Sequence, residues 1–165
     1  MESKIIFLDI DGVLNSEKFY KNEAQHERWQ RAESEGYSRE EQDAIANIDP
    51  ESVKWLNYVI NKTNAELVIS STWRFDENLK TKLSFMGIKP FIGITPKTWE
   101  RHRGTEIQMW LDRHPEVTNY VILDDDCDML DSQLNNFVNT SWLEGLNEDS
   151  ANKAIKILND GAIKA

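Results

Sequence analysis

Short apolar runs alternate with longer amphipathic segments along most of this chain. Four of the runs are continuous stretches of mainly apolar residues, which are typical of strands buried on both faces of a parallel sheet. These runs are residues 5–8, 67–69, 91–94 and 120–123, and residues 137–138 form a weaker fifth run. The pattern therefore predicts five core strands.

Helical patterns separate the predicted strands. Asp49 followed by Pro50 predicts the start of one helix. Val53, Leu56 and Ile60 recur at helical spacing and would form its apolar face. Two further helices are predicted, one over residues 107–111 that ends near residues 114–115, and one that begins at Asp149. Strands that alternate with helices predict an α/β fold with a mostly parallel sheet.

Three of the predicted strands run directly into polar clusters. Asp9 and Asp11 follow the first strand, with Gly12 allowing a sharp turn. Residues 70–74 (Ser-Ser-Thr-Trp-Arg) follow the second strand, and residues 124–126 (Asp-Asp-Asp) follow the fourth. Each cluster alone could be a turn or a helix cap. Together they would meet at one edge of a parallel sheet, where such sheets bind ligands. Carboxylates that lie this close favour a hard cation such as Mg²⁺.

Residues 16–48 form a very polar insertion directly after the first of these clusters. Ser38 followed three residues later by Glu41 predicts a capping box at a helix start. We expect one or two short helices, with Gly36 near a break. The insertion is either an exposed helical excursion or a small cap beside the site. We favour the cap, because the insertion leaves the site and returns to it.

The length and composition of the chain exclude several classes of function. A length of 165 residues suits one domain over residues 1–165. The net charge of −10 argues against a long footprint on a nucleic-acid backbone, although a phosphorylated nucleic-acid end or a small phosphate ester remains compatible. The single cysteine, Cys127, excludes an intrachain disulfide and a cysteine-based zinc site. Neither a signal peptide nor a bilayer-spanning apolar stretch is visible, so we expect a cytoplasmic protein without a membrane partner.

The motifs resemble, in order, those of the haloacid dehalogenase (HAD) superfamily, whose members are mostly phosphatases. Asp9-x-Asp11-Gly12 matches the first motif, Ser70 the second, and Asp124-Asp125 the fourth. The third, basic motif has three candidates, of which we prefer the last: Lys97, Arg101 and Arg103. More narrowly, residues 7–15, 69–74 and 121–126 resemble a small bacterial and phage branch linked to Swiss Army Knife RNA-repair proteins. This resemblance implies a three-layer Rossmann-like fold with a five-stranded sheet and a small helical cap.

The resemblance also implies roles for the motif residues. Asp9 would be the nucleophile that forms an aspartyl-phosphate, and Asp11 would be the general acid and base. Ser70 and Arg103 would bind the phosphoryl group, and the Ser71 amide and Arg74 would assist them. Magnesium would bind the following groups: the carboxylate of Asp9, the backbone carbonyl of Asp11, Asp124 and, directly or through water, Asp125. The implied enzyme is a Mg²⁺-dependent phosphomonoesterase, a hydrolase.

Two other classes of protein fit part of this pattern. A receiver-type signalling domain is also parallel α/β with clustered aspartates, but it accepts phosphate after its third strand, where this chain has Thr95 and no aspartate. The second is a non-catalytic phosphate- or metal-binding module that acts through a partner. We favour the enzyme, because all the motif residues are present. Turnover of a generic phosphate ester separates the two.

Overall fold

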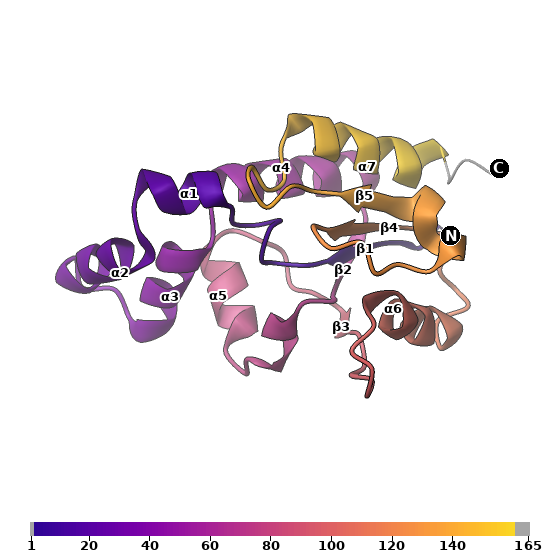
Figure 1. Ribbon diagram of the computed structural model, residues 1–165, viewed down its shortest axis with the longest axis horizontal. Coiled ribbons are helices and arrows are strands. Elements are labelled where there is room, and N and C mark those ends of the chain that lie inside the picture. The colour runs from indigo at the N-terminus through magenta and orange to yellow at the C-terminus, as the bar shows by residue number, and fades with distance from the viewer. Residues whose placement is uncertain (1, 161–165) are drawn as a thin grey trace.

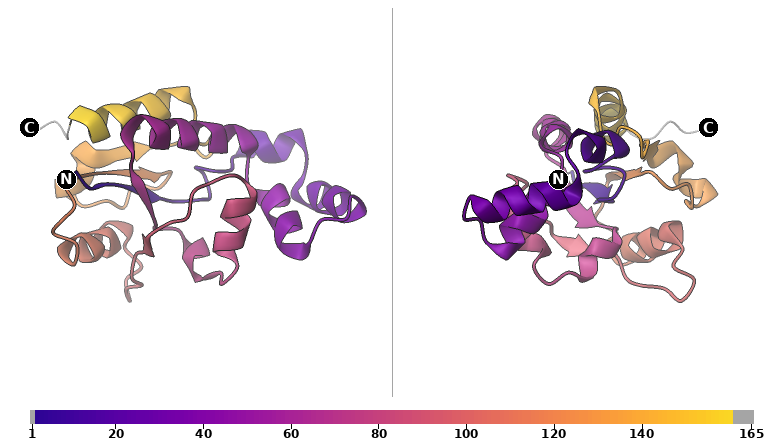
Figure 2. Two further views of the ribbon diagram at one scale, coloured as in Figure 1. Left: turned by 180° about the vertical axis from the view of Figure 1, so that it is seen from behind. Right: turned by 60° about the vertical axis from the view of Figure 1, so that its left-hand side comes forward.

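The structure is a computed structural model and describes residues 2–160. Within this range, five parallel strands form one sheet in the order β3-β2-β1-β4-β5. The strands are β1 (Lys4–Leu8), β2 (Glu66–Ile69), β3 (Gly93–Ile94), β4 (Asn119–Asp124) and β5 (Phe137–Asn139). Helices lie on both sides of the sheet, as Figures 1 and 2 show. The predicted three-layer, Rossmann-like α/β fold is therefore confirmed, and the sheet is parallel throughout.

The two faces of the sheet carry separate apolar cores. On one face, α4 (Pro50–Thr63) and α7 (Glu148–Asp160) pack against each other. Ile6 and Leu8 of β1 contribute to this core. On the other face, Ile5 and Phe7 pack in a second core with side chains of α6 (Arg103–Asp112). Alternate residues of one strand therefore feed opposite cores, which explains why β1 is a continuous apolar run.

The insertion after β1 contains three helices, so the expectation of one or two was wrong. They are α1 (Glu17–Asn22), α2 (Gln25–Ser34) and α3 (Arg39–Asn47). Ser16 caps α1 by accepting a hydrogen bond from the Phe19 amide at 3.1 Å, which accounts for the additional start. Gly36 lies between α2 and α3 with a φ of 87°, and Ser38 and Glu41 form the predicted capping box.

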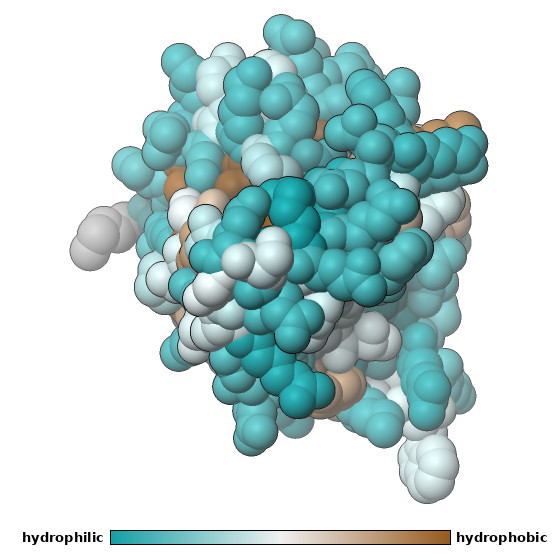
Figure 3. All heavy atoms as spheres, turned by 90° about the vertical axis from the view of Figure 1, so that its left-hand side faces the viewer, coloured by the Kyte–Doolittle hydropathy of each residue, from teal (hydrophilic) through white to brown (hydrophobic). Residues whose placement is uncertain are grey.

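The insertion is helical, as predicted, and its role as a cap stays a prediction. The three helices of the insertion lie beyond the carboxyl ends of the strands (Figure 1). The face of the molecule on this side is largely hydrophilic (Figure 3), which explains the weak apolar periodicity of the insertion. The insertion is attached to the rest of the domain through α3, which packs against α2 and against α5 (Leu79–Phe85).

Several element ends differ from the prediction. The helix α5 and two short 3₁₀ helices, η1 (Thr72–Phe75) and η2 (Asp131–Asn136), were not predicted. The edge strand β3 is shorter than predicted, and Pro90 and Pro96 on either side of it offer no amide to extend the pairing. The helix α7 begins one residue early, because the Asn147 side chain caps it by accepting a hydrogen bond from the Ser150 amide at 3.0 Å. Among residues 2–160, no helix is long and apolar enough to cross a membrane.

Candidate active site

The register of the sheet places three predicted site residues side by side on neighbouring strands, at the same height along the strand direction. Leu8, the last residue of β1, pairs with Ile69 of β2 and Leu123 of β4. The next residues along these three strands are Asp9, Ser70 and Asp124. Because the strands are parallel neighbours, the three side chains leave the sheet side by side at its carboxyl edge.

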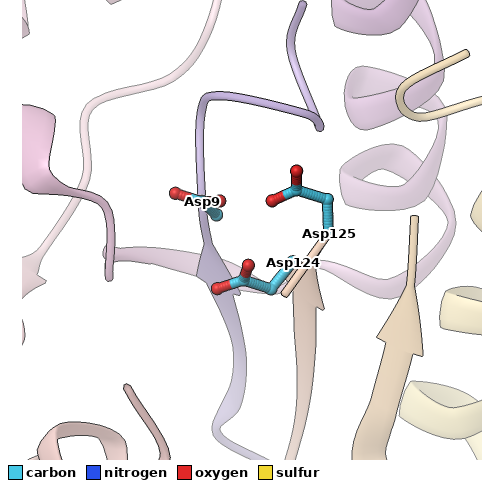
Figure 4. Close-up of side chains that lie close together, drawn as sticks. All are labelled: Asp9, Asp124 and Asp125. Atoms are coloured by element: carbon cyan, nitrogen blue, oxygen red, sulfur yellow. The ribbon is translucent and has the colours of Figure 1, made fainter. Parts of the chain in front are cut away.

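Asp9, Asp124 and Asp125 form an acidic cluster at this edge (Figure 4). Each can place a carboxylate oxygen within 4.8 Å of the other two. Asp9 is only 6% exposed and Asp124 is fully buried. Burial, followed by the charge of Asp124, raises the pKa of Asp9 to about 9. Burial raises the pKa of Asp124 to about 6, and it also raises the pKa of Asp125. The cluster therefore needs positive charge at neutral pH.

The chemistry of the cluster suits a magnesium ion. Its donors are carboxylate oxygens, which are the ligands that hard divalent cations prefer. One of them, Asp124 Oδ2, is buried and makes no hydrogen bond among residues 2–160, although Arg103 Nε lies 3.4 Å away. A cation would satisfy this oxygen and offset the repulsion between the carboxylates. The residues present therefore fit the predicted cofactor.

The Asp11 carboxylate lies outside the acidic cluster. The Asp11 side chain is exposed, and its two oxygens accept hydrogen bonds from different side chains. Asn15 Nδ2 donates to Oδ1 at 3.0 Å, and Trp73 Nε1 donates to Oδ2 at 3.2 Å. The structure thus separates the two aspartates of the first motif, with Asp9 buried among carboxylates and Asp11 held at the surface by neutral donors. The roles of Asn15 and Trp73 as donors to Asp11 were not predicted.

Gly12 makes this separation possible. Its φ is +81°, a left-handed conformation that residues with a side chain rarely adopt. A Cβ atom at this position would lie 2.2 Å from Asp125 Oδ2. The Gly12 carbonyl accepts a hydrogen bond from Thr140 Oγ1 at 2.8 Å, which ties the turn to the segment after β5. The turn can therefore approach the acidic cluster only with glycine at this position.

The two serines after β2 have different surroundings. Ser70 is fully buried, and its Oγ has no hydrogen-bond partner within the described part of the chain. Ser71 Oγ accepts a hydrogen bond from the Trp73 amide at 3.1 Å and so caps η1. Ser70 therefore has the free hydroxyl beside Asp9. A role for Ser71 in phosphate binding would depend on its backbone amide and remains a prediction.

Arg103 is the basic candidate that reaches the acidic cluster. Its Nε lies 3.4 Å from Asp124 Oδ2, and its Nη1 is buried without a hydrogen-bond partner among the described residues. Asp128 Oδ2 accepts a hydrogen bond from the Arg103 amide at 2.9 Å and so anchors the start of α6. Lys97 and Arg101 are exposed side chains of the loop before this helix. The geometry thus favours Arg103 over the other two candidates.

Arg74, which the sequence places at the same strand end, points away from the cluster. Its guanidinium donates to Glu106 Oε2 at 2.6 Å in a buried ion pair. Its other donors bond to the backbone carbonyls of three residues: Ser71, Thr95 and Pro96. Arg74 therefore joins the η1 segment to α6, and each of its three guanidinium nitrogens donates to a group of the protein, which disfavours a role in binding phosphate.

Comparison with known proteins identifies the family. Residues 5–151 match a family described as the HAD domain in Swiss Army Knife RNA repair proteins. Searches of curated proteins and of solved structures gave no significant match. The matched range begins one residue into β1 and includes the other four strands, the helical insertion and every predicted site residue.

Proposed function

Because this chain belongs to the family of HAD domains found in Swiss Army Knife RNA repair proteins, we propose that it is a Mg²⁺-dependent phosphomonoesterase that acts through Asp9. Family membership supports a phosphatase-like hydrolase in general. The observation that carries the finer proposal is the shared level of Asp9, Ser70 and Asp124 at the carboxyl edge of the sheet. It supports a nucleophilic role for the Asp9 carboxylate, which lies between the Ser70 hydroxyl and the acidic Asp124.

The reaction follows from the two environments of the first motif. An Asp9 oxygen attacks phosphorus, and the bond between phosphorus and the leaving oxygen breaks. Asp11, which the structure holds outside the cluster, donates a proton to that oxygen. Asp11 then takes a proton from water, which attacks the aspartyl-phosphate and releases inorganic phosphate with Asp9 restored.

The phosphoryl group needs hydrogen-bond donors and positive charge. Ser70 Oγ and Arg103 Nη1 are buried polar atoms without hydrogen-bond partners among residues 2–160. A phosphoryl oxygen beside Asp9 would satisfy both of them. The carboxylates of Asp9, Asp124 and Asp125, with the backbone carbonyl of Asp11, would hold Mg²⁺, which would offset the negative charge gathered there.

The substrate that we propose is a phosphate monoester on a nucleic-acid end or on a small molecule. The small helical cap and the exposed Asp11 support access by a large leaving group. The net charge of −10 argues for contact with a short phosphorylated end rather than with a long nucleic-acid backbone.

The first test is turnover of an aryl phosphate with and without metal. We expect hydrolysis that requires Mg²⁺, because burial and the neighbouring carboxylates disfavour the ionised, nucleophilic form of Asp9 unless a cation is bound. Release of inorganic phosphate measures the rate, and a chelator should abolish the reaction. Activity that resists the chelator would overturn the magnesium requirement. The absence of turnover across a broad panel of phosphate esters would overturn the enzyme proposal.

The alternative is a non-catalytic module that binds metal or phosphate and acts through a partner. Thermal melting with millimolar Mg²⁺ separates binding from catalysis, because a ligand that binds only the folded state raises the melting temperature. Stabilisation without turnover would favour this module. Stabilisation together with turnover would favour the enzyme, and a melting curve that Mg²⁺ does not move would count against the metal site.

Arg103→Ala should lower kcat for an aryl phosphate by about 10²–10³-fold, because it removes a charged donor beside the reacting group. Lys97→Ala and Arg101→Ala should cost much less with this substrate, since neither is paired with the acidic cluster. Arg113→Ala is the matched control, because Arg113 is an exposed arginine at the other end of α6. If Lys97→Ala proves the most severe change, the basic motif residue is Lys97.

A further inference from the structure

A cavity of about 200 Å³ lies beside the candidate active site. Its wall includes Thr72, Phe75, Lys97, Arg101 and Arg103. Arg103 belongs to both places, because its Nε lies 3.4 Å from Asp124 Oδ2. Thr72 follows the serine pair at the end of β2 by one residue. The Arg103 side chain therefore links the cavity to the acidic cluster.

The cavity is positively charged in a chain whose net charge is −10. Four cationic side chains and one carboxylate line it. The carboxylate, Glu106, is neutralised by the buried ion pair with Arg74, and its other oxygen lies 3.4 Å from the Thr98 amide and hydroxyl. Lys97 and Arg101 form no ion pair with any residue in the range 2–160. Two exposed cations thus face the cavity with their charge available.

The backbone of Arg101 adopts a left-handed conformation. Arg101 has a φ of 51°, and it is one of two non-glycine residues with positive φ in the described range. Its amide donates to the Thr98 carbonyl at 3.2 Å, which closes a turn just before α6. Left-handed backbone in a residue with a side chain costs energy and often occurs at binding sites. The turn sets Arg101 on the cavity wall beside Arg103.

Phe75 adds an apolar surface to the same cavity. It is 57% exposed, so its ring is accessible to a ligand in the cavity. Arg74 Cζ lies 4.4 Å from its ring centroid, and Lys97 Nζ lies 5.9 Å from it. An exposed aromatic ring beside unpaired cations is the combination that binds nucleotides by stacking and charge.

We propose that this cavity is a subsite for a second phosphate group of the substrate. The inference rests on the proposed phosphatase function, which places the first phosphate at Asp9. A nucleotide that carries two phosphates would then span the site, with one at Asp9 and the other between Lys97 and Arg101. The second phosphate is either a monoester, as in a nucleoside bisphosphate, or the adjacent phosphodiester of a nucleic-acid end.

The test compares kcat/KM across substrates with one and two phosphates. The single-phosphate substrates are adenosine 3′-monophosphate and 5′-monophosphate. The others are adenosine 3′,5′-bisphosphate and RNA dinucleotides with a terminal 3′- or 5′-phosphate. A substrate with two phosphates should exceed the better monophosphate by about tenfold, since each added charged hydrogen bond contributes on that scale. The bisphosphate and dinucleotide arms show whether the second group is a monoester or a diester.

A double variant identifies the cavity as the source of this preference. In Lys97→Gln/Arg101→Gln, the ratio of kcat/KM between the best substrate with two phosphates and the monophosphate should fall by about tenfold. Arg113→Gln/Lys153→Gln removes the same charge from exposed positions on α6 and α7 and should keep the ratio. Equal kcat/KM for all substrates would overturn the subsite, and so would a preference that survives the Lys97/Arg101 change.

Failure of the subsite can be distinguished from failure of the proposed function. If aryl phosphate is hydrolysed but a second phosphate gives no advantage, only the subsite is wrong. If no phosphate ester is hydrolysed, calorimetric titration of adenosine 3′,5′-bisphosphate and adenosine 5′-monophosphate into Asp9→Asn measures the preference without turnover. Tighter binding of the bisphosphate that is lost in the Lys97/Arg101 background would support the subsite. Equal binding of the two nucleotides would overturn it.

Discussion

Asp9→Asn is expected to abolish turnover, with kcat for an aryl phosphate lower by about 10⁴-fold or more, because an amide cannot replace the carboxylate nucleophile. The fold should persist, since asparagine is nearly the same size as aspartate and adds no repulsion to the crowded acidic cluster. After an acid quench, mass spectrometry should find no phosphate bound to the protein. Residual activity near the wild-type level would exclude Asp9 as the nucleophile.

The matched control for this change is Asp126→Asn. Asp126 is an exposed aspartate two residues after Asp124, and its backbone amide donates to Asp124 Oδ1 at 2.9 Å. Asparagine keeps that amide, so the control removes a nearby charge without changing the acidic cluster. Its turnover should remain within a few-fold of wild type, since exposed charges interact weakly. Circular dichroism of both variants should match the wild-type spectrum.

The central strands could be predicted from the sequence because they are buried on both faces. In β1, Ile5 and Phe7 face one core and Ile6 and Leu8 face the other, so residues 5–8 include no polar position. The edge strand β3 was also predicted, but its predicted start at residue 91 was two residues too early. The helix α5 was missed because it is only seven residues long, which is too short for its apolar positions to show a helical period.

The candidate site also has parts that the sequence predicts and parts that it does not. Asp9, Ser70 and Asp124 could be placed together in advance, because each directly follows a strand and neighbouring parallel strands end at one edge. The hydrogen bond from Trp73 to Asp11 joins residues 62 positions apart in the chain. It depends on η1, which no periodic pattern marks. Contacts that depend on such a turn need the three-dimensional structure.

The environment of Asp11 also explains why the two aspartates should behave differently when changed. Asp9 is buried among carboxylates, whereas Asp11 is exposed and accepts hydrogen bonds from Asn15 and Trp73. Asp11→Asn therefore leaves the nucleophile and the acidic cluster intact. It removes only the group that protonates the leaving oxygen and later activates water.

Asp11→Asn should consequently trap phosphate on Asp9 when the leaving group is good. An activated aryl phosphate needs little protonation to depart, so the first step proceeds, whereas hydrolysis of the aspartyl-phosphate lacks its base. Steady-state turnover should fall by about 10²–10⁴-fold, the usual contribution of general acid–base catalysis. Mass spectrometry after an acid quench should find one phosphate on the peptide that contains Asp9, and the double variant Asp9→Asn/Asp11→Asn should carry none. Phosphate on Asp11 in the Asp9→Asn protein would reverse the two roles, because the nucleophile would then be the exposed aspartate rather than the buried one.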